Sequence, residues 1–295
     1  MKRDGFRNQV CAYTLAEVCV GLGLFSIVGG LAYTVLMSST TLFAKNVSLN
    51  SSSTVLRSAL DRIYSEINQS NGMPKLINAD GSAPLNPAGP AAGIIFDRYV
   101  GGPYVVTNPG ALGLPATAQS FEMKSSTNPL ASPPIPVSND VICLDNCTTR
   151  PVVNSCSASL SGSFQTLAVT LKAPLGKSIS WSADTQQTAY AVHRKAFVVV
   201  PVAANGRGEL RMYNDAETLP NFNNPASYIV LTGEIGGQVG ENTPFSIVTQ
   251  NGATFLNIAM RVEDQQLNKY LATQQSKEFN TFLRVDTMLR PRNFL

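Results

Sequence analysis

The most constraining feature of this sequence is an uncharged apolar run close to its N-terminus. The twenty residues from Val18 to Met37 contain no Asp, Glu, Lys or Arg, and Glu17 stands immediately before them. At about 1.5 Å per residue, a helix of this length crosses a hydrocarbon core of about 30 Å. A carboxylate at the edge of such a segment is costly unless it is paired. The run therefore predicts a membrane-spanning helix with a functional acid at its start.

The segment before this run is short, polar and positively charged. Lys2, Arg3 and Arg7 outnumber Asp4, which gives a charge of +2. The positive-inside tendency keeps such a segment in the cytoplasm and places the rest of the chain outside. A secretory signal peptide has an apolar region of only about 7 to 15 residues and is cleaved after it. The sequence thus favours a retained anchor, and a plain signal anchor is the simplest alternative.

The junction itself has a recognisable order of residues. Ala12 is followed by Tyr13-Thr14-Leu15, then by Glu17, and then by the charge-free run. This order resembles the class III signal of type IV prepilins and type II secretion pseudopilins, although that family usually has Gly where this chain has Ala12 and Phe where it has Tyr13. The resemblance implies cleavage between Ala12 and Tyr13 by a prepilin peptidase, which then methylates the new amino terminus.

Such processing would give Glu17 a partner. Cleavage creates a positive amino group on Tyr13, one helical turn from Glu17, and methylation keeps that charge. In a filament the amine would come from a neighbouring subunit, so that each incoming subunit is set in register by an ion pair. The resemblance implies a leader at 1–12, a helix at 13–70 whose part 13–37 spans the membrane, and a head domain at 71–295.

The helical pattern continues beyond the membrane run. Apolar residues recur at three, four or seven positions and form one stripe: Leu49, Leu56, Leu60, Ile63 and Ile67. Asn71-Gly72 and Pro74 end the pattern. A helix from Tyr13 to Ser70 has 58 residues and a length of about 87 Å. The Ser- and Asn-rich stretch Val47 to Thr54 predicts a looser segment within it.

The head reads as mainly antiparallel β structure. Short strand candidates lie at Gly93 to Val100 and at Pro103 to Thr107, and the Pro-rich stretch Asn128 to Pro134 reads as a loop. Alternating patterns predict further strands at 166–172, 256–263 and 282–289, and a hairpin joins 193–200 to 209–213 through Asn205-Gly206-Arg207-Gly208. We expect an α+β fold with the long helix packed on this sheet over one core.

Two stretches of the head carry a looser resemblance. Gly208-Glu209-Leu210-Arg211 and Leu289-Arg290-Pro291-Arg292-Asn293 look like the corresponding stretches of the larger minor pilins and minor pseudopilins. They imply a minor rather than a major subunit.

The cysteines predict one disulfide outside the membrane. Cys11 lies in the leader and Cys19 in the apolar run, which leaves Cys143, Cys147 and Cys156. In an oxidising compartment, Cys143 pairs with Cys147, or one of these two pairs with Cys156. Three cysteines at these spacings match no zinc pattern.

Enzyme and ligand motifs are missing from the sequence. The only histidine is His193, and no Gly-x-Ser-x-Gly elbow, P-loop or dinucleotide fingerprint occurs. Without its leader the chain has a net charge of +1, which disfavours nucleic-acid binding. We expect no cofactor, with structural calcium at Asp140/Asp145 or Glu263/Asp264 as a weak alternative.

These observations predict a structural protein and no enzyme. It would be a single-pass inner-membrane subunit with an extracytoplasmic head, drawn into a periplasmic or cell-surface filament of a type IV pilus, a type II secretion system or a competence system. Its partners would be the prepilin peptidase and other pilins or pseudopilins, with no small-molecule substrate. Two alternatives are a filament-displayed adhesin or DNA-binding subunit, using Tyr190, His193, Arg194 and Lys195, and a membrane-anchored hydrolase.

Overall fold

The computed structural model of the chain describes residues 14–107, 112–125, 135–161, 164–182, 186–202, 208–215, 228–235, 243–263 and 282–290. Several sequence predictions lie outside these residues: Ala12 and Tyr13 at the cleavage site, the Pro-rich loop at 128–134, the hairpin turn at 205–207, Asp264, and the C-terminal stretch 291–293. The chain divides into two compact units, residues 1–51 with 266–281 and residues 52–265 with 282–295. Each unit is described by itself.

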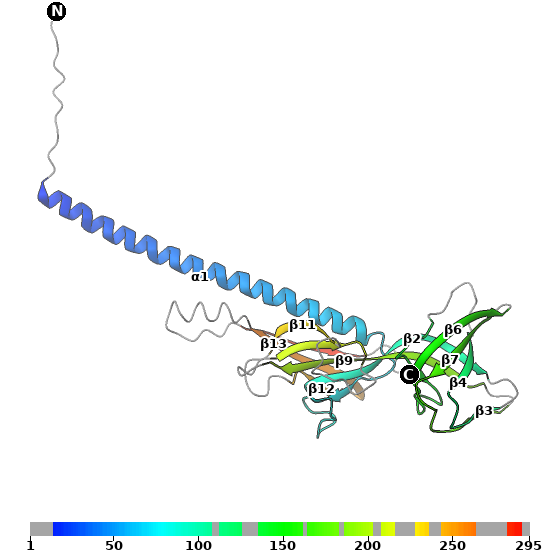
Figure 1. Cartoon of the computed structure of the whole chain (residues 1–295). Coiled ribbons are helices and arrows are strands. Elements are labelled where there is room, and N and C mark those ends of the chain that lie inside the picture. The colour runs from blue at the N-terminus through cyan, green and yellow to red at the C-terminus, as the bar shows by residue number, and fades with distance from the viewer. Residues whose placement is uncertain are drawn as a thin grey trace, which may run out of the picture. The chain divides into compact units, whose positions relative to one another are not determined.

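The helix α1 (Leu15–Ile67) has 53 residues, which corresponds to about 80 Å. Figure 1 shows it as one uninterrupted coil. The prediction of a looser segment at Val47 to Thr54 was wrong, because the helix continues through these residues. Ser and Asn cost only about half a kcal/mol each in a helix, too little to interrupt one that extends on both sides. The helix ends before Gly72, whose φ of 100° suits glycine.

In the first unit, the helical residues from Leu15 onward turn large apolar side chains outward. Leu15 is 84% exposed and Phe25 is 78% exposed, and the same holds for the Leu, Val and Ile side chains of the run between and beyond them. The helix is long and apolar enough to cross a membrane, and the window that passes this test is unburied. Water is a poor solvent for such a surface, and a membrane is an environment that suits it.

The second unit contains a large sheet in which the strands pair antiparallel. Its order is β12-β13-β11-β10-β9-β2-β4-β7-β6, with β1 on β2, β14 on β13 and β5 on β9, while β3 and β8 form a separate pair. The bounds are β1 (Lys75–Ile77), β2 (Gly93–Thr107), β3 (Gly113–Leu114), β4 (Ser120–Ser125), β5 (Val141–Cys143), β6 (Val153–Ser161), β7 (Phe164–Leu171), β8 (Ile179–Ser180), β9 (Thr188–Pro201), β10 (Gly208–Tyr213), β11 (Tyr228–Ile235), β12 (Phe245–Gln250), β13 (Ala253–Glu263) and β14 (Phe282–Leu289).

The predicted strands at 166–172, 256–263 and 282–289 are confirmed as β7, β13 and β14. The β9–β10 hairpin is also confirmed, with Pro201 opposite Gly208 and Ala196 opposite Tyr213. The two short strands predicted at 93–100 and 103–107 form a single strand, β2, because both halves pair with β9 across register shifts between Tyr99 and Tyr104. The fold is therefore α+β, with a long N-terminal helix packed on a mainly antiparallel sheet.

The helix contributes its predicted stripe, except Leu49, to a hydrophobic cluster on the sheet. Leu56, Ile63 and Ile67 are fully or almost fully buried, and Leu60 packs against the same cluster. The sheet side of this cluster includes Ile94 and Phe96 of β2, Phe197 and Val199 of β9, and Leu256, Ile258 and Met260 of β13. Burial at about 25 cal/mol per Å² of apolar surface holds the end of α1 to the sheet.

The expectation of one core was wrong, because a second large cluster lies farther along the same strands. Tyr104 and Val106 of β2 and Ala189 and Ala191 of β9 pack with side chains of β4, β5, β6 and β7. At about 3.3 Å per residue, the 15 residues of β2 span about 50 Å, longer than one compact core. In Figure 1, β2 and β9 run from the group around β11–β13 toward β4, β6 and β7.

Candidate functional site

The predicted assembly residue Glu17 lies in the first turn of α1, where Thr14 holds its carboxylate. The backbone N–H of Thr14 donates to Glu17 Oε2 at 2.9 Å, and the Thr14 hydroxyl donates to the same oxygen at 3.1 Å. In return, the backbone N–H of Glu17 donates to Thr14 Oγ1 at 3.4 Å. This reciprocal arrangement is a capping box, which supplies partners to backbone groups that an α-helix leaves unpaired at its start.

Thr14 is a residue that our sequence analysis missed as part of the site. The signal was present in the spacing Thr14-Leu15-Ala16-Glu17, which is the Thr-x-x-Glu pattern of a capping box before an apolar run. The consequence is that Glu17 has a local partner within a single chain. Its carboxylate is thereby positioned at the N-terminal end of the apolar helix.

The four glycines of the apolar run are not required by packing within this chain. A Cβ atom added at Gly21, Gly23, Gly29 or Gly30 would meet nothing within 4 Å among the described residues. Small residues in membrane helices allow close approach of a second helix. With respect to the residues that the structure describes, these positions are therefore open on the surface of α1.

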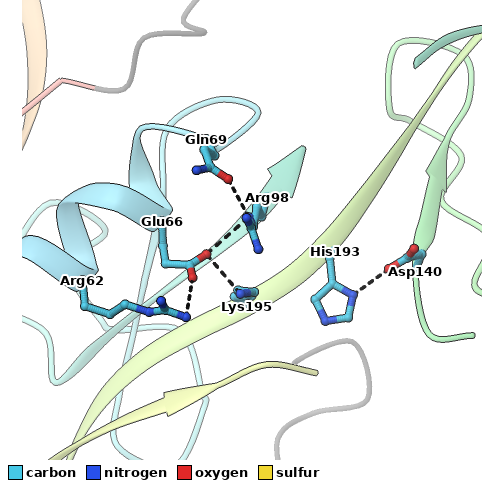
Figure 2. Close-up of polar contacts among 7 residues, drawn as sticks. All are labelled: Arg62, Glu66, Gln69, Arg98, Asp140, His193 and Lys195. Carbon is cyan, nitrogen blue, oxygen red and sulfur yellow. Dashed lines mark hydrogen bonds and ion pairs between the residues drawn. The ribbon is translucent and has the colours of Figure 1, made fainter. Parts of the chain in front are cut away.

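At the other end of α1, Glu66 is buried among positively charged side chains, as Figure 2 shows. Glu66 is only 4% exposed, and its Oε2 lies 3.0 Å from Lys195 Nζ of β9 and 3.4 Å from Arg98 Nε of β2. Its Oε1 lies 2.9 Å from Arg62 Nη2 on the preceding helical turn. Burial lowers the pKa of Lys195, which the hydrogen bond and the charge of Glu66 oppose. The group attaches the helix to two strands.

Figure 2 also shows the contact between His193 of β9 and Asp140, which lies just before β5. Asp140 is 1% exposed; its Oδ1 lies 2.6 Å from His193 Nδ1 and its Oδ2 accepts the backbone N–H of Val137 at 2.8 Å. The hydrogen bond to Asp140 raises the pKa of His193, and a hydrogen bond with the backbone of Asn214 adds to this effect. Nδ1 of His193 is thus engaged by a buried carboxylate.

The stretch proposed for DNA contact does not present free positive charge. Lys195 is buried on Glu66, His193 is paired with Asp140, and Arg194 Nε lies 3.0 Å from Asp97 Oδ1. Tyr190 is partly exposed and lies beside Tyr99, with ring centroids 6.5 Å apart. Each of these three positively charged or titratable side chains therefore lies beside a carboxylate of the same fold.

Asp140 and Asp145, two of the candidate calcium ligands, have different partners. The Asp140 carboxylate binds His193 and a backbone N–H, whereas Asp145 binds Thr148 and, at 3.2 Å, Lys177. The side chain of Glu263 and the whole of Asp264 lie outside the described residues. Within the part of the chain that the structure describes, no group of three or more His, Cys, Asp and Glu side chains is placed to hold a metal ion.

The head cysteines separate into a pair and a single residue. Cys143 ends β5 and Cys147 packs against the small cluster to which Cys143 belongs, whereas Cys156 of β6 packs against the second large cluster. Of the alternatives left open by the sequence, Cys143 and Cys147 are the two that the fold brings into contact.

The comparisons with known proteins identify no relative. No protein-family model matches the chain, and neither the curated proteins nor the solved structures contain a match. The function must therefore be argued from the residues and from the fold.

Proposed function

We propose that this chain is a structural filament subunit, a minor pilin or pseudopilin of a type IV pilus, type II secretion or competence system. A prepilin peptidase would remove residues 1–12, and the chain would wait in the inner membrane with its head outside. Assembly into a periplasmic or cell-surface filament would then proceed through α1. The chain performs no chemistry, and its partners are other pilins or pseudopilins.

The observation that carries this proposal is the combination of Glu17 with the exposed apolar surface of α1. A membrane anchor needs about 20 apolar residues, and a carboxylate at their edge is costly unless it is paired. Here Glu17 is held by Thr14 at the start of a helix that continues into the head domain. An amine on the N-terminus of a neighbouring subunit can replace Thr14 as its partner, because the two groups carry opposite charges.

The long helix supports the same proposal. A plain signal anchor needs no rigid continuation, whereas α1 extends to Ile67 and buries Leu56, Ile63 and Ile67 in the head. In a filament built from apolar helices at its centre, each helix has to carry its own head. The glycines of α1, which no side chain of the described residues covers, allow neighbouring helices to approach closely.

The test is Glu17→Ala in cells that carry the assembly system. We expect the variant to enter the membrane and to be cleaved normally, since the apolar run and the residues at the cut are unchanged. Its amount in sheared filaments should fall more than about tenfold, because an unpaired buried amine costs about 3–5 kcal/mol. The matched control is Asp61→Ala, which removes an exposed acid of α1 in the head.

The test measures three quantities: the amount of chain in carbonate-washed membranes, the share of the chain that is cleaved, and the amount of chain in sheared filaments. Normal incorporation of Glu17→Ala would overturn the proposal that this acid sets the subunit register. Purified chain that still begins at Met1, or that is trimmed beyond Met37, would overturn the family assignment itself.

A further inference from the structure

A tight turn outside the proposed assembly site brings Cys143 and Cys147 together. Cys143 is 2% exposed at the end of β5, in a small cluster with Val141 and Val192 against which Cys147 packs. The two thiols are close enough to hydrogen-bond to each other. Cys156 lies in β6 and packs against the second large cluster.

The backbone of the turn is built to return Cys147 to Cys143. Asp145, Asn146 and Cys147 have φ values of 48°, 52° and 62°, three consecutive residues in the left-handed region. This region is unfavourable for residues other than glycine, although Asp and Asn tolerate it better. Two backbone hydrogen bonds between Leu144 and Thr149, at 2.9 and 3.3 Å, close the turn.

The two sulfurs differ in their surroundings. The hydrogen bond from Cys143 and the positive charge of Arg150 lower the pKa of Cys147 to about 7, against the effect of burial. The same hydrogen bond and burial raise the pKa of Cys143. A thiolate is the nucleophile in disulfide exchange. The partly exposed Cys147 is therefore the better attacking thiol, and the buried Cys143 is the better resolving thiol.

We propose that Cys143 and Cys147 form the disulfide of the head domain, that Cys147 reacts first, and that Cys156 remains a thiol. The proposal rests on the proposed function in one respect, since an exported head meets an oxidising compartment. The oxidant is a thiol–disulfide oxidoreductase in its oxidised form.

The reaction balances in two exchanges. The Cys147 thiolate attacks one sulfur of the oxidant's disulfide and expels the other as a thiolate, which leaves a mixed disulfide. Cys143 then loses its proton and attacks Cys147 Sγ, and the remaining oxidant sulfur leaves as a thiolate. The chain gives up two electrons and two protons, and the oxidant is reduced to a dithiol.

The location suggests what the bond does. The side-chain amide of Asn71, just after α1, lies 4.0 Å from Cys147 Sγ, and the Asn71 backbone N–H donates to the Asp97 carbonyl at 2.7 Å. The Asp97 carboxylate lies 2.7 Å from Arg150 Nη2. Linking Cys147 to Cys143 would therefore fix this turn beside the segment through which α1 joins the sheet.

The test uses the full chain in detergent, reduced and then treated with oxidised glutathione. After blocking with N-ethylmaleimide, a protease that cleaves before aspartate separates Asp140–Leu144, which contains Cys143, from Asp145–Ala183, which contains the other two cysteines. We expect the two peptides to stay joined without reductant in the wild type and in Cys156→Ser. In the wild type the maleimide should be on Cys156.

Release of Asp140–Leu144 from Cys156→Ser, or maleimide on Cys147 in the wild type, would overturn the pairing. For the order of reaction, Cys143→Ser and Cys147→Ser are compared in the Cys156→Ser background at pH 7. The glutathione adduct should form several-fold faster on Cys147, and equal or reversed rates would overturn that order.

A sample blocked with maleimide inside the cells separates this inference from the proposed function. A joined pair in that sample supports both. Free thiols in cells, together with a joined pair after glutathione treatment, would support the pairing and overturn the exported location of the head.

Discussion

Individual acids show how differently one residue type is used in this chain. Glu17 stands at the exposed start of α1 with Thr14 as its partner, whereas Glu66 is buried with three positively charged neighbours. The sequence indicated Glu17 because an acid beside an uncharged run is visible in a linear pattern. It did not indicate that Glu66 is buried, since Lys195 comes from a strand 129 residues later.

The contact of His193 with Asp140 predicts a pH dependence of stability. Asp140 raises the pKa of His193 in the folded chain. The contribution of this pair is therefore fully present below the unfolded pKa of about 6.5 and is lost as pH rises through the raised folded value. A hydrogen bond to a charged group contributes about 1.5–3 kcal/mol, so His193→Gln should lower the unfolding free energy by about this amount at pH 6 and by less at pH 9.

Denaturant unfolding of wild type and His193→Gln in detergent at several pH values checks this prediction. The difference between the two chains isolates His193 from Cys147, whose pKa of about 7 places its titration in the same range. A difference that stays constant from pH 6 to pH 9 would contradict the assignment.

Between elements, apolar burial and one ionic group join α1 to the sheet. The stripe at Leu56, Ile63 and Ile67 packs on β2, β9 and β13, and Glu66 reaches Lys195 and Arg98. The stripe was predictable because its apolar residues recur three and four positions apart in the sequence. The contacts of Glu66 with Lys195 and Arg98 were not, because these two residues come from separate strands.

Glu66 and Lys195 should be strongly coupled. Glu66→Met leaves the buried Lys195 without its carboxylate and should cost about 3–5 kcal/mol of unfolding free energy. Adding Lys195→Met should recover most of this loss, because two apolar side chains then fill the same space. Arg62 and Arg98 have side chains that are 49% and 38% exposed, so water can solvate them in both variants.

A double-mutant cycle with Lys195→Met measures this coupling. If the losses of unfolding free energy from the two single changes add up, with no recovery in the double variant, then the Glu66–Lys195 pair does not hold α1 to the sheet.

At the scale of the whole molecule, the buried clusters depend on only the last part of α1. Every helix residue in them lies at position 56 or beyond, and the second compact unit begins at Ser52. A chain that begins at Ser52 should therefore remain folded, with a β-rich circular dichroism spectrum and a melting temperature within a few degrees of the full chain.

A second truncation is the control for this prediction. A chain that begins at Gln69 loses Leu56, Ala59, Ile63 and Ile67, and each large buried side chain is worth about 2–5 kcal/mol. It should lose the cooperative melting of the first cluster. If the chain that begins at Ser52 also fails to melt cooperatively, then the first part of α1 supports the head.

The sequence by itself determined the features that depend on neighbouring positions. The membrane-length run, the stripe of α1, the alternating strands β7, β13 and β14 and the β9–β10 hairpin all follow from periodicity and turn residues within short windows. Even the capping box of Thr14 and Glu17 was present in a spacing of three.

Only the tertiary structure decided the features that depend on residues far apart in the chain. It joined two predicted strands into β2, divided the expected core into two clusters, surrounded Glu66 with positive charge and brought Cys147 rather than Cys156 to Cys143. The physical reason is that burial and ion pairing depend on distance in space, and a local pattern does not state which distant strand supplies the partner.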